Sequence, residues 1–172
     1  VGLGFRVPPA EISRALADFS PASRRSESLE VNGVLVLNDT YNSNPDSAAA
    51  ALETLAGMKV PGKKVAVLAD MLELGAAAER EHRRIGRLAG KAGVDYLLTY
   101  GPLSRLTHEA STVSFKVHYE QKNMLAEYLA ELLTAGDAVL VKGSRGMRME
   151  DVVLFLKERL QPGAAASRRT SA

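Results

Sequence analysis

The sequence predicts an α/β fold in which a mostly parallel, open sheet carries helices on both faces. Short apolar runs of strand length alternate with amphipathic runs of helical length along most of the chain. Such alternation favours right-handed crossovers between parallel strands. A chain of 172 residues with 46% hydrophobic residues can also bury one core of ordinary domain size. Together these observations predict a Rossmann-like three-layer sandwich.

The expected elements follow in chain order. Residues 29–37 form a strand or a tight hairpin that turns at Asn32-Gly33, a dipeptide suited to a two-residue turn. The other expected strands are residues 64–69, 96–100, 114–119 (an edge strand) and 137–141, and the expected helices are residues 48–58, 78–91, 103–110, 121–133 and 149–160.

The two ends of the chain are expected to lie outside this domain. The N-terminus is apolar and lacks Met, so we expect the natural chain to begin earlier. Residues 9–19 read as a short amphipathic helix, and residues 20–28 read as a polar linker. The predicted organisation is therefore a helix and linker in residues 1–24, a domain in residues 25–160, and a disordered tail in residues 161–172.

Composition excludes several functional classes. The chain has 22 Lys and Arg against 20 Asp and Glu, so no strong basic field favours nucleic acid. It has no cysteine, which excludes disulfides, thiolate metal sites and a cysteine nucleophile. No apolar run approaches the roughly 18 residues of a membrane span, and no signal peptide is evident. We therefore expect a cytoplasmic protein without a membrane span.

The stretch from Asn38 to Ser47 carries more polar groups than a strand-to-helix turn needs. Asn44 is a good helix N-cap, and Pro45 and Asp46 suit the first helical turn. This capping does not require Asp39, Tyr41 and Asn42, which we assign to ligand binding.

Ligands of open parallel sheets bind beyond the carboxyl ends of the strands. The last loop at that edge, residues 142–146, is basic and glycine-spaced, so it favours a phosphate or a carboxylate. A carboxylate at a strand end, such as that of Asp39, is suited to the two hydroxyls of a ribose. A plain helix entry at residues 142–146, and an Asp39 that bonds only its own turn, remain alternatives. The four loops at this edge offer Asp39, Tyr41 and Asn42; Asp70 and Glu73; Tyr100; and Lys142, Ser144 and Arg145.

Two apparent motifs do not hold. Residues 57–64 approach a phosphate-binding P-loop, but Lys64 replaces the required Ser or Thr and a strand follows instead of a helix. Glu79 and His82 have the spacing of a carboxylate-bridged metal site, but no second copy exists. We read His82 as a surface residue or one that supports a site, and we expect no metal site in this chain.

Three ordered segments carry a family resemblance. They are residues 38–47, residues 67–75 with His82 following, and residues 140–147 with Glu150. In these segments the chain resembles the C-terminal domain of the Mur ligases, and among them the branch that adds D-alanyl-D-alanine to UDP-N-acetylmuramoyl-tripeptide. The resemblance covers roughly residues 20–160.

The resemblance implies an ATP-dependent amide ligase of peptidoglycan biosynthesis that works through an acyl phosphate. It implies nucleotide contacts from Arg25, Asp39, Tyr41 and Asn42. It implies substrate or anion contacts from Asn44, Asp70, Glu73, Lys142, Ser144 and Arg145, the anion being either phosphate or the dipeptide carboxylate.

The chain departs from this family in lacking a P-loop. By this resemblance, a central domain would carry the P-loop and the Mg²⁺ ligands, an N-terminal domain would hold the UDP end, and this chain would pack on both. Residues 1–24, with the helix at residues 9–19, would be the tail of that central ATPase domain plus the linker. We therefore expect no catalytic residue in this chain and no catalysis by it alone. The alternatives are another ligase of the superfamily, such as a folylpolyglutamate synthetase, and a free-standing nucleotide-binding or receiver-like regulatory domain.

Overall fold

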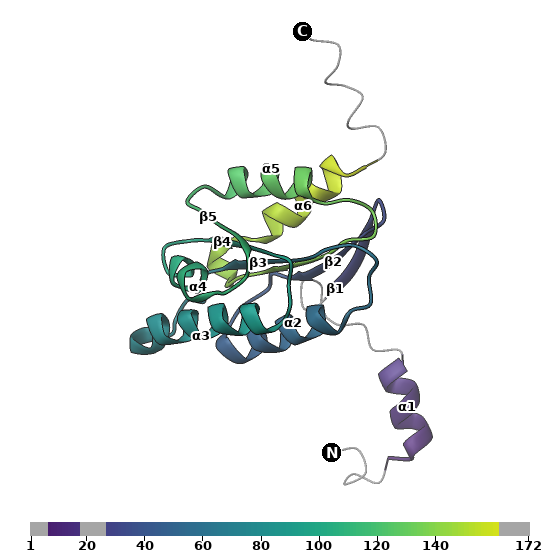
Figure 1. The fold of residues 1–172 in the computed structure, drawn as a ribbon. Coiled ribbons are helices and arrows are strands. Elements are labelled where there is room, and N and C mark those ends of the chain that lie inside the picture. Colours follow the sequence, from purple (N-terminus) through teal and green to yellow (C-terminus); the bar gives the residue numbers. More distant parts are fainter. Residues whose placement is uncertain (1–6, 18–26, 162–172) are drawn as a thin grey trace.

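A single six-stranded sheet organises the molecule, which was analysed as a computed structural model that describes residues 7–17 and 27–161. Helices cover the sheet on both faces (Figure 1). The strands are β1 (Glu27–Val31), β2 (Val34–Asp39), β3 (Lys64–Ala69), β4 (Tyr96–Tyr100), β5 (Phe115–Tyr119) and β6 (Ala138–Lys142). The helices are α1 (Pro9–Ala17), α2 (Pro45–Gly57), α3 (Ala78–Lys91), α4 (Ser104–Ala110), α5 (Lys122–Leu132) and α6 (Glu150–Arg159), with 3-10 turns η2 (Gly75–Ala77) and η3 (Arg145–Met147).

The strand order is β1-β2-β6-β3-β4-β5, and every pair is parallel except β1 with β2. The predicted hairpin is confirmed: Asn32 and Gly33 have φ of 49° and 78°, the left-handed conformation that a two-residue turn between twisted strands requires. The predicted edge position of residues 114–119 is also confirmed. The fold class expected from the sequence is therefore the one observed.

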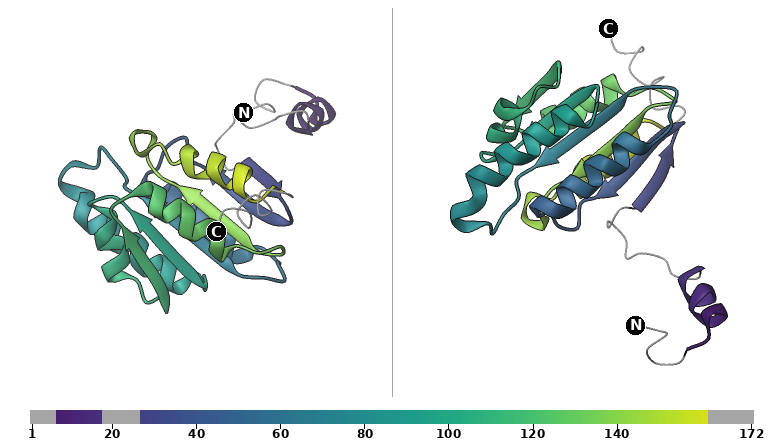
Figure 2. Two further views of the ribbon diagram at one scale, coloured as in Figure 1. Left: turned by 90° about the horizontal axis from the view of Figure 1, so that it is seen from above. Right: turned by 60° about the horizontal axis from the view of Figure 1, so that its bottom comes forward.

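Alternate residues of each central strand enter two separate cores. Val65 and Val67 of β3 pack with α5 and α6, whereas Ala66 and Leu68 pack with α2 and α3. Figure 2 shows the two layers, with α5 and α6 over one face and α2 and α3 over the other. Burial on both faces explains why the central strands are nearly continuous apolar runs.

The sheet has a switch point next to β6. From β3 the chain proceeds outward through α3 to β4, whereas from β6 it turns to α6 on the opposite face (Figure 1). The carboxyl ends of β2, β6 and β3 therefore meet at a crevice, where open α/β sheets bind ligands. In the register of β2 with β6, Asp39 pairs with Lys142. Lys142 is thus the last residue of a strand, one position later than the expected strand end.

The segments outside the sheet domain are partly described. The expected helix at residues 9–19 is present as α1, which stands apart from the sheet in Figures 1 and 2. Most of the expected linker, including Arg25, and nearly all of the expected tail lie outside the described residues. Among the residues that are described, no helix is long and apolar enough to cross a bilayer.

Candidate functional site

The loop after β2 is held by its own side chains at both ends. At its start, Thr40 Oγ1 donates to Asn38 Oδ1 at 2.8 Å. At its end, Asn44 caps α2: Ser47 N donates to Asn44 Oδ1 at 2.8 Å, and Asn44 N donates to Ser47 Oγ at 3.1 Å. Pro45 follows the cap, as the sequence predicts. Between these fixed ends, Tyr41 and Asn42 are exposed.

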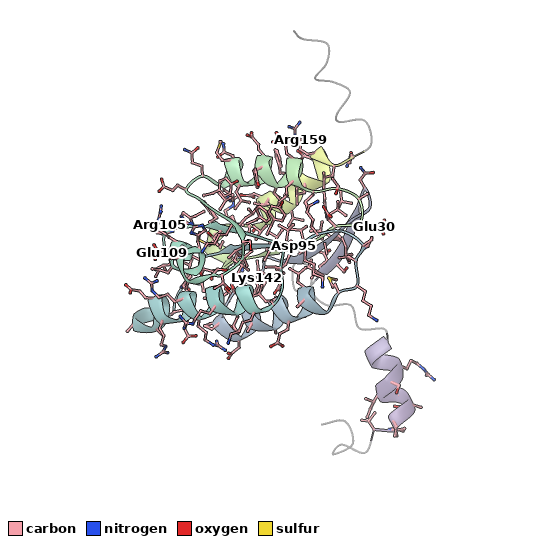
Figure 3. The ribbon with its side chains drawn as sticks, in the orientation of Figure 1. Glu30, Asp95, Arg105, Glu109, Lys142 and Arg159 are labelled. Carbon is pink, nitrogen blue, oxygen red and sulfur yellow. The ribbon has the colours of Figure 1, made fainter. Side chains whose placement is uncertain are left out.

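A buried ion pair joins this loop to β6. Lys142 Nζ donates to Asp39 Oδ2 at 2.5 Å and to the carbonyl oxygen of Asn42 at 3.0 Å. The side chain of Lys142 is 1% exposed and that of Asp39 is 13% exposed. Figure 3 shows Lys142 inside the outline of the fold, whereas Arg105 and Glu109 lie near its margin.

This geometry shows what holds the ammonium group of Lys142. Its ammonium group is buried and bound to a carboxylate, so Lys142 positions Asp39 and the Asn42 carbonyl, and its expected contact with an anion stays a prediction. The sequence placed Lys142 in a glycine-spaced loop beside Arg145, and that pattern does not reveal which of the two cations points inward.

Ser144 has a similar structural role. Its hydroxyl donates to the carbonyl oxygen of Ser43 at 3.2 Å and accepts from Leu72 N at 2.8 Å, so it joins the loops after β2 and β3. Ser144 is 3% exposed. This hydroxyl therefore joins two loops, and the expected anion contact of Ser144, which lines a cavity at the crevice, stays a prediction.

The carboxylate of Asp70 points away from the crevice, and its expected substrate contact stays a prediction. Its carboxylate accepts from the backbone N–H groups of Leu103 at 3.2 Å and Ser104 at 2.6 Å, at the start of α4. Asp70 is 1% exposed, so its charge stabilises the N-terminal end of a helix instead of reaching the crevice.

His82 supports the loop after β3, which is one of the two roles that the sequence left open for it. Met71 N donates to His82 Nε2 at 3.0 Å, and His82 Nδ1 lies 2.7 Å from the Ala78 carbonyl oxygen. Because Nε2 must accept, Nδ1 carries the proton and donates to Ala78. His82 is 1% exposed, so the expectation of a surface position is wrong and that of a supporting position fits. Spacing alone suggested only a metal site and gave no signal of this bond.

Two adjoining cavities open at the crevice and share the Tyr41–Asn44 segment. The first, of about 370 Å³, is lined by Asp39, Tyr41, Asn42, Ser47, Thr54 and Lys142, among others. The second, of about 420 Å³, is lined by Tyr41, Asn42, Asn44, Glu73, Arg145 and Gly146, among others. Both volumes lie in the range of small-molecule sites. The structure thus gathers most of the expected site residues around one edge of the sheet.

The second cavity has charges of both signs. The guanidinium carbon of Arg145 lies 5.8 Å from the centre of the Tyr41 ring, within the range of a cation–π contact. Glu73 has φ of 64°, a left-handed conformation that is uncommon for a residue other than glycine.

Tyr100 lies elsewhere, in a third cavity with Arg105, His118 and Met147. Within the described ranges, no group of three or more His, Asp or Glu residues is placed to hold a metal ion.

Comparison with known proteins identifies the family. The family model described as "Mur ligase, glutamate ligase domain" matches residues 24–145. The chain is 33% identical to the UDP-N-acetylmuramoyl-tripeptide–D-alanyl-D-alanine ligase of Bacillus subtilis over 162 residues, which cover 91% of this chain and 35% of that protein. It is 41% identical to the ligase of the same name from Escherichia coli over 126 residues, covering 72% of this chain and 27% of that protein.

Solved structures agree with this result. A MurF structure from Acinetobacter baumannii superposes with a TM-score of 0.83 at 27% identity, covering 91% of this chain and 35% of that one. The MurF ligase of Thermotoga maritima in complex with ADP superposes with a TM-score of 0.74 at 27% identity, covering 87% and 36%. This chain therefore spans about a third of the length of its relatives and belongs to the Mur ligase family, as the C-terminal, glutamate ligase domain.

Proposed function

We propose that this chain is the C-terminal domain of an ATP-dependent ligase that adds D-alanyl-D-alanine to UDP-N-acetylmuramoyl-tripeptide in the cytoplasm. The observation that carries the proposal is the meeting of Asp39, Tyr41, Asn42 and Arg145 around two adjoining cavities at one sheet edge. The names of the Bacillus subtilis and Escherichia coli relatives supply the substrates. Neither of these relatives is a folylpolyglutamate synthetase or a regulatory domain, so the relatives favour this reading over those alternatives.

The first cavity is suited to the nucleotide. Asp39 is a carboxylate fixed by Lys142 at the wall of a cavity of about 370 Å³, where it can accept hydrogen bonds from the two hydroxyls of a ribose. The Thermotoga maritima relative was crystallised with ADP, which supports a nucleotide in this region. Tyr41 and Asn42 extend the same wall.

The second cavity is suited to an anionic group of the reacting ligands. Arg145 presents a planar fork of donors that fits either a phosphate or a carboxylate, and it is exposed there. Glu73 and Asn44 line the same cavity and can hold the polar groups around that anion. With Lys142 bound to Asp39, Arg145 is the exposed cation of the loop after β6 that can face a ligand.

The proposed reaction has two steps. ATP, with Mg²⁺ held by another part of the full protein, supplies the phosphoryl group that activates the tripeptide carboxylate as an acyl phosphate. The amine of D-alanyl-D-alanine then attacks the acyl carbon, phosphate leaves with the C–O bond electrons, and the nitrogen loses a proton. This chain contributes by closing over the nucleotide, orienting its ribose and one anionic group, and excluding water.

The chain by itself is expected to bind but not to catalyse. Its sequence has no P-loop, so the phosphoryl donor is not held against the carboxylate that it must activate. We propose that the loops after β2, β3 and β6 pack against the central and N-terminal domains of the full protein. Formation of ADP by the chain alone, dependent on D-alanyl-D-alanine, would contradict this division of labour.

Calorimetry with ADP and Mg²⁺ tests the nucleotide site on this chain. Asp39→Ala removes charge-assisted hydrogen bonds of about 1.5–3 kcal/mol, so the Kd for ADP should rise roughly tenfold to a hundredfold. Glu131→Ala, which removes an exposed carboxylate from α5, is the matched control and should leave the Kd unchanged. Equal ADP affinity in the Asp39→Ala variant and the parent chain would refute the assignment of the first cavity.

A further inference from the structure

The turn between β6 and α6 holds a residue in an unfavourable backbone conformation. Arg148, which follows η3, has φ of 49° and ψ of 47°, in the left-handed region that residues other than glycine seldom occupy. Such a conformation persists only where surrounding contacts fix it, and it occurs often at binding and catalytic sites. The contacts that fix this turn therefore bear on the site that it carries.

Lys122, the first residue of α5, supplies those contacts from another part of the chain. Its Nζ donates to the carbonyl oxygens of Met147 at 3.3 Å and Arg148 at 2.9 Å, and to Asp151 Oδ2 at 2.6 Å. Its side chain is 22% exposed. The hydrogen bond and the charge of Lys122 also hold the pKa of the Asp151 carboxyl below its usual value.

The position of this lysine is not explained by its own helix. A cation in the first turn of a helix faces the positive end of the helix dipole, which is unfavourable. The hydrogen bonds of Lys122 to Met147, Arg148 and Asp151 lie instead on the turn after β6 and the first turn of α6. The lysine therefore acts as a clamp on that turn.

The clamped turn separates two of the cavities at the sheet edge. Arg145 and Gly146 line the second cavity, and Met147 lines the third, with Tyr100 and His118. Ser144, bonded to Ser43 and Leu72, fixes the start of the turn. Lys122 fixes its end, so the backbone that carries Arg145 lies between two anchors.

We propose that Lys122 is a positioning residue for ligand binding: it clamps the η3 turn so that Arg145 faces the second cavity. The proposal rests on the function proposed above for that cavity and adds a residue outside the crevice that controls it. Loss of the clamp lets the turn relax from its left-handed conformation and displaces Arg145. Displacements of about 1 Å in a binding group can cost up to about a hundredfold in rate.

Steady-state kinetics of the full-length ligase test the proposal. Arg145→Ala should raise the KM of the ligand whose anion it holds, either ATP or D-alanyl-D-alanine. Lys122→Met should raise the same KM by roughly tenfold or more, with a smaller change in kcat. Lys59→Met, at an exposed lysine before β3, is the matched control and should leave both KM values unchanged.

A double variant shows whether Lys122 acts through Arg145. If it does, Lys122→Met in the Arg145→Ala background should raise that KM no further. Lys122→Arg, which keeps a cationic donor, should recover part of the loss. Asp151→Asn removes one partner of Lys122 and should give a smaller rise in the same KM, so it serves as the test if Lys122→Met folds poorly. The inference is overturned by additive effects, or by an unchanged KM in Lys122→Met and Asp151→Asn while Arg145→Ala raises it. If Arg145→Ala changes neither KM, the proposed function of the second cavity fails instead.

Discussion

Replacing Lys142 by Met tests whether the buried ion pair, rather than an exposed cation, organises the crevice. The change keeps the length of the side chain but removes the ammonium that binds Asp39 and the Asn42 carbonyl. Breaking a buried pair typically costs about 3–5 kcal/mol, because one charge is left without its partner. Asp39 is 13% exposed and lines a cavity, so water can reach it. We therefore expect the low end of that range, about 3 kcal/mol.

Urea denaturation of the chain, followed by circular dichroism, measures this loss. At this chain length about 3 kcal/mol corresponds to roughly 6–12 °C in Tm. The matched double variant Asp39→Asn with Lys142→Met replaces both charges by neutral groups, and it should lose less stability than the sum of the single variants. A loss below about 0.5 kcal/mol in Lys142→Met, the range of ordinary surface changes, would refute the buried role.

Four further predictions concern the supporting structure. A Cβ on Gly86 of α3 would lie 2.2 Å from the Thr107 carbonyl oxygen, so Gly86→Ala should cost about 1–3 kcal/mol in urea denaturation. Gly57→Ala, where nothing lies within 4 Å, should be neutral or slightly stabilising. Asp70→Ala should lower the free energy of unfolding by about 1 kcal/mol because it removes the acceptors for the first N–H groups of α4, without changing the Kd for ADP in calorimetry. Burial opposes ionisation of Asp137, but hydrogen bonds from Lys63 and Thr134 outweigh it and lower its pKa below 3.8. The contribution of Asp137 to the free energy of unfolding is thus present above about pH 4 and is lost as pH falls through the lowered pKa. When the free energy of unfolding is measured at decreasing pH, the Asp137→Asn variant should not show this decrease.

The fold could be predicted from the sequence because the turn, helix-start and strand signals all indicate the same order of elements. The Asn32-Gly33 turn, the Asn44-Pro45 helix start and the apolar central strands each specify an element from residues close in sequence. The edge strand at residues 114–119 was likewise predicted from its weaker apolar pattern. Strand order was not predicted, because it depends on which face each crossover takes, and no local pattern encodes that choice.

The sequence predicted which residues gather at the sheet edge but not which way their side chains point. Loops at strand ends correctly gathered Asp39, Tyr41, Asn42, Glu73 and Arg145 at one edge. Spacing could not show that the cation at the end of β6 points inward to a carboxylate or that the acid after β3 caps a helix. Those roles depend on contacts between residues 33 to 103 positions apart in the chain.

The Lys122 clamp lay beyond sequence reasoning for the same reason. Its partners on the turn after β6 are 25 to 29 positions away. The lysine itself sits where helix propensity gives no signal of a role, and only the left-handed conformation of Arg148 draws attention to the turn.

The dependence of ADP release on ATP concentration, measured in the full-length ligase with D-alanyl-D-alanine and the tripeptide substrate present, tests the central claim most directly. If the edge formed by β2, β3 and β6 closes over the nucleotide, Asp39→Ala should lower kcat/KM for ATP by roughly tenfold to a hundredfold. Glu131→Ala, at an exposed position of α5 that lines neither cavity, should leave it unchanged. An Asp39→Ala ligase with the parent kcat/KM for ATP would contradict the account.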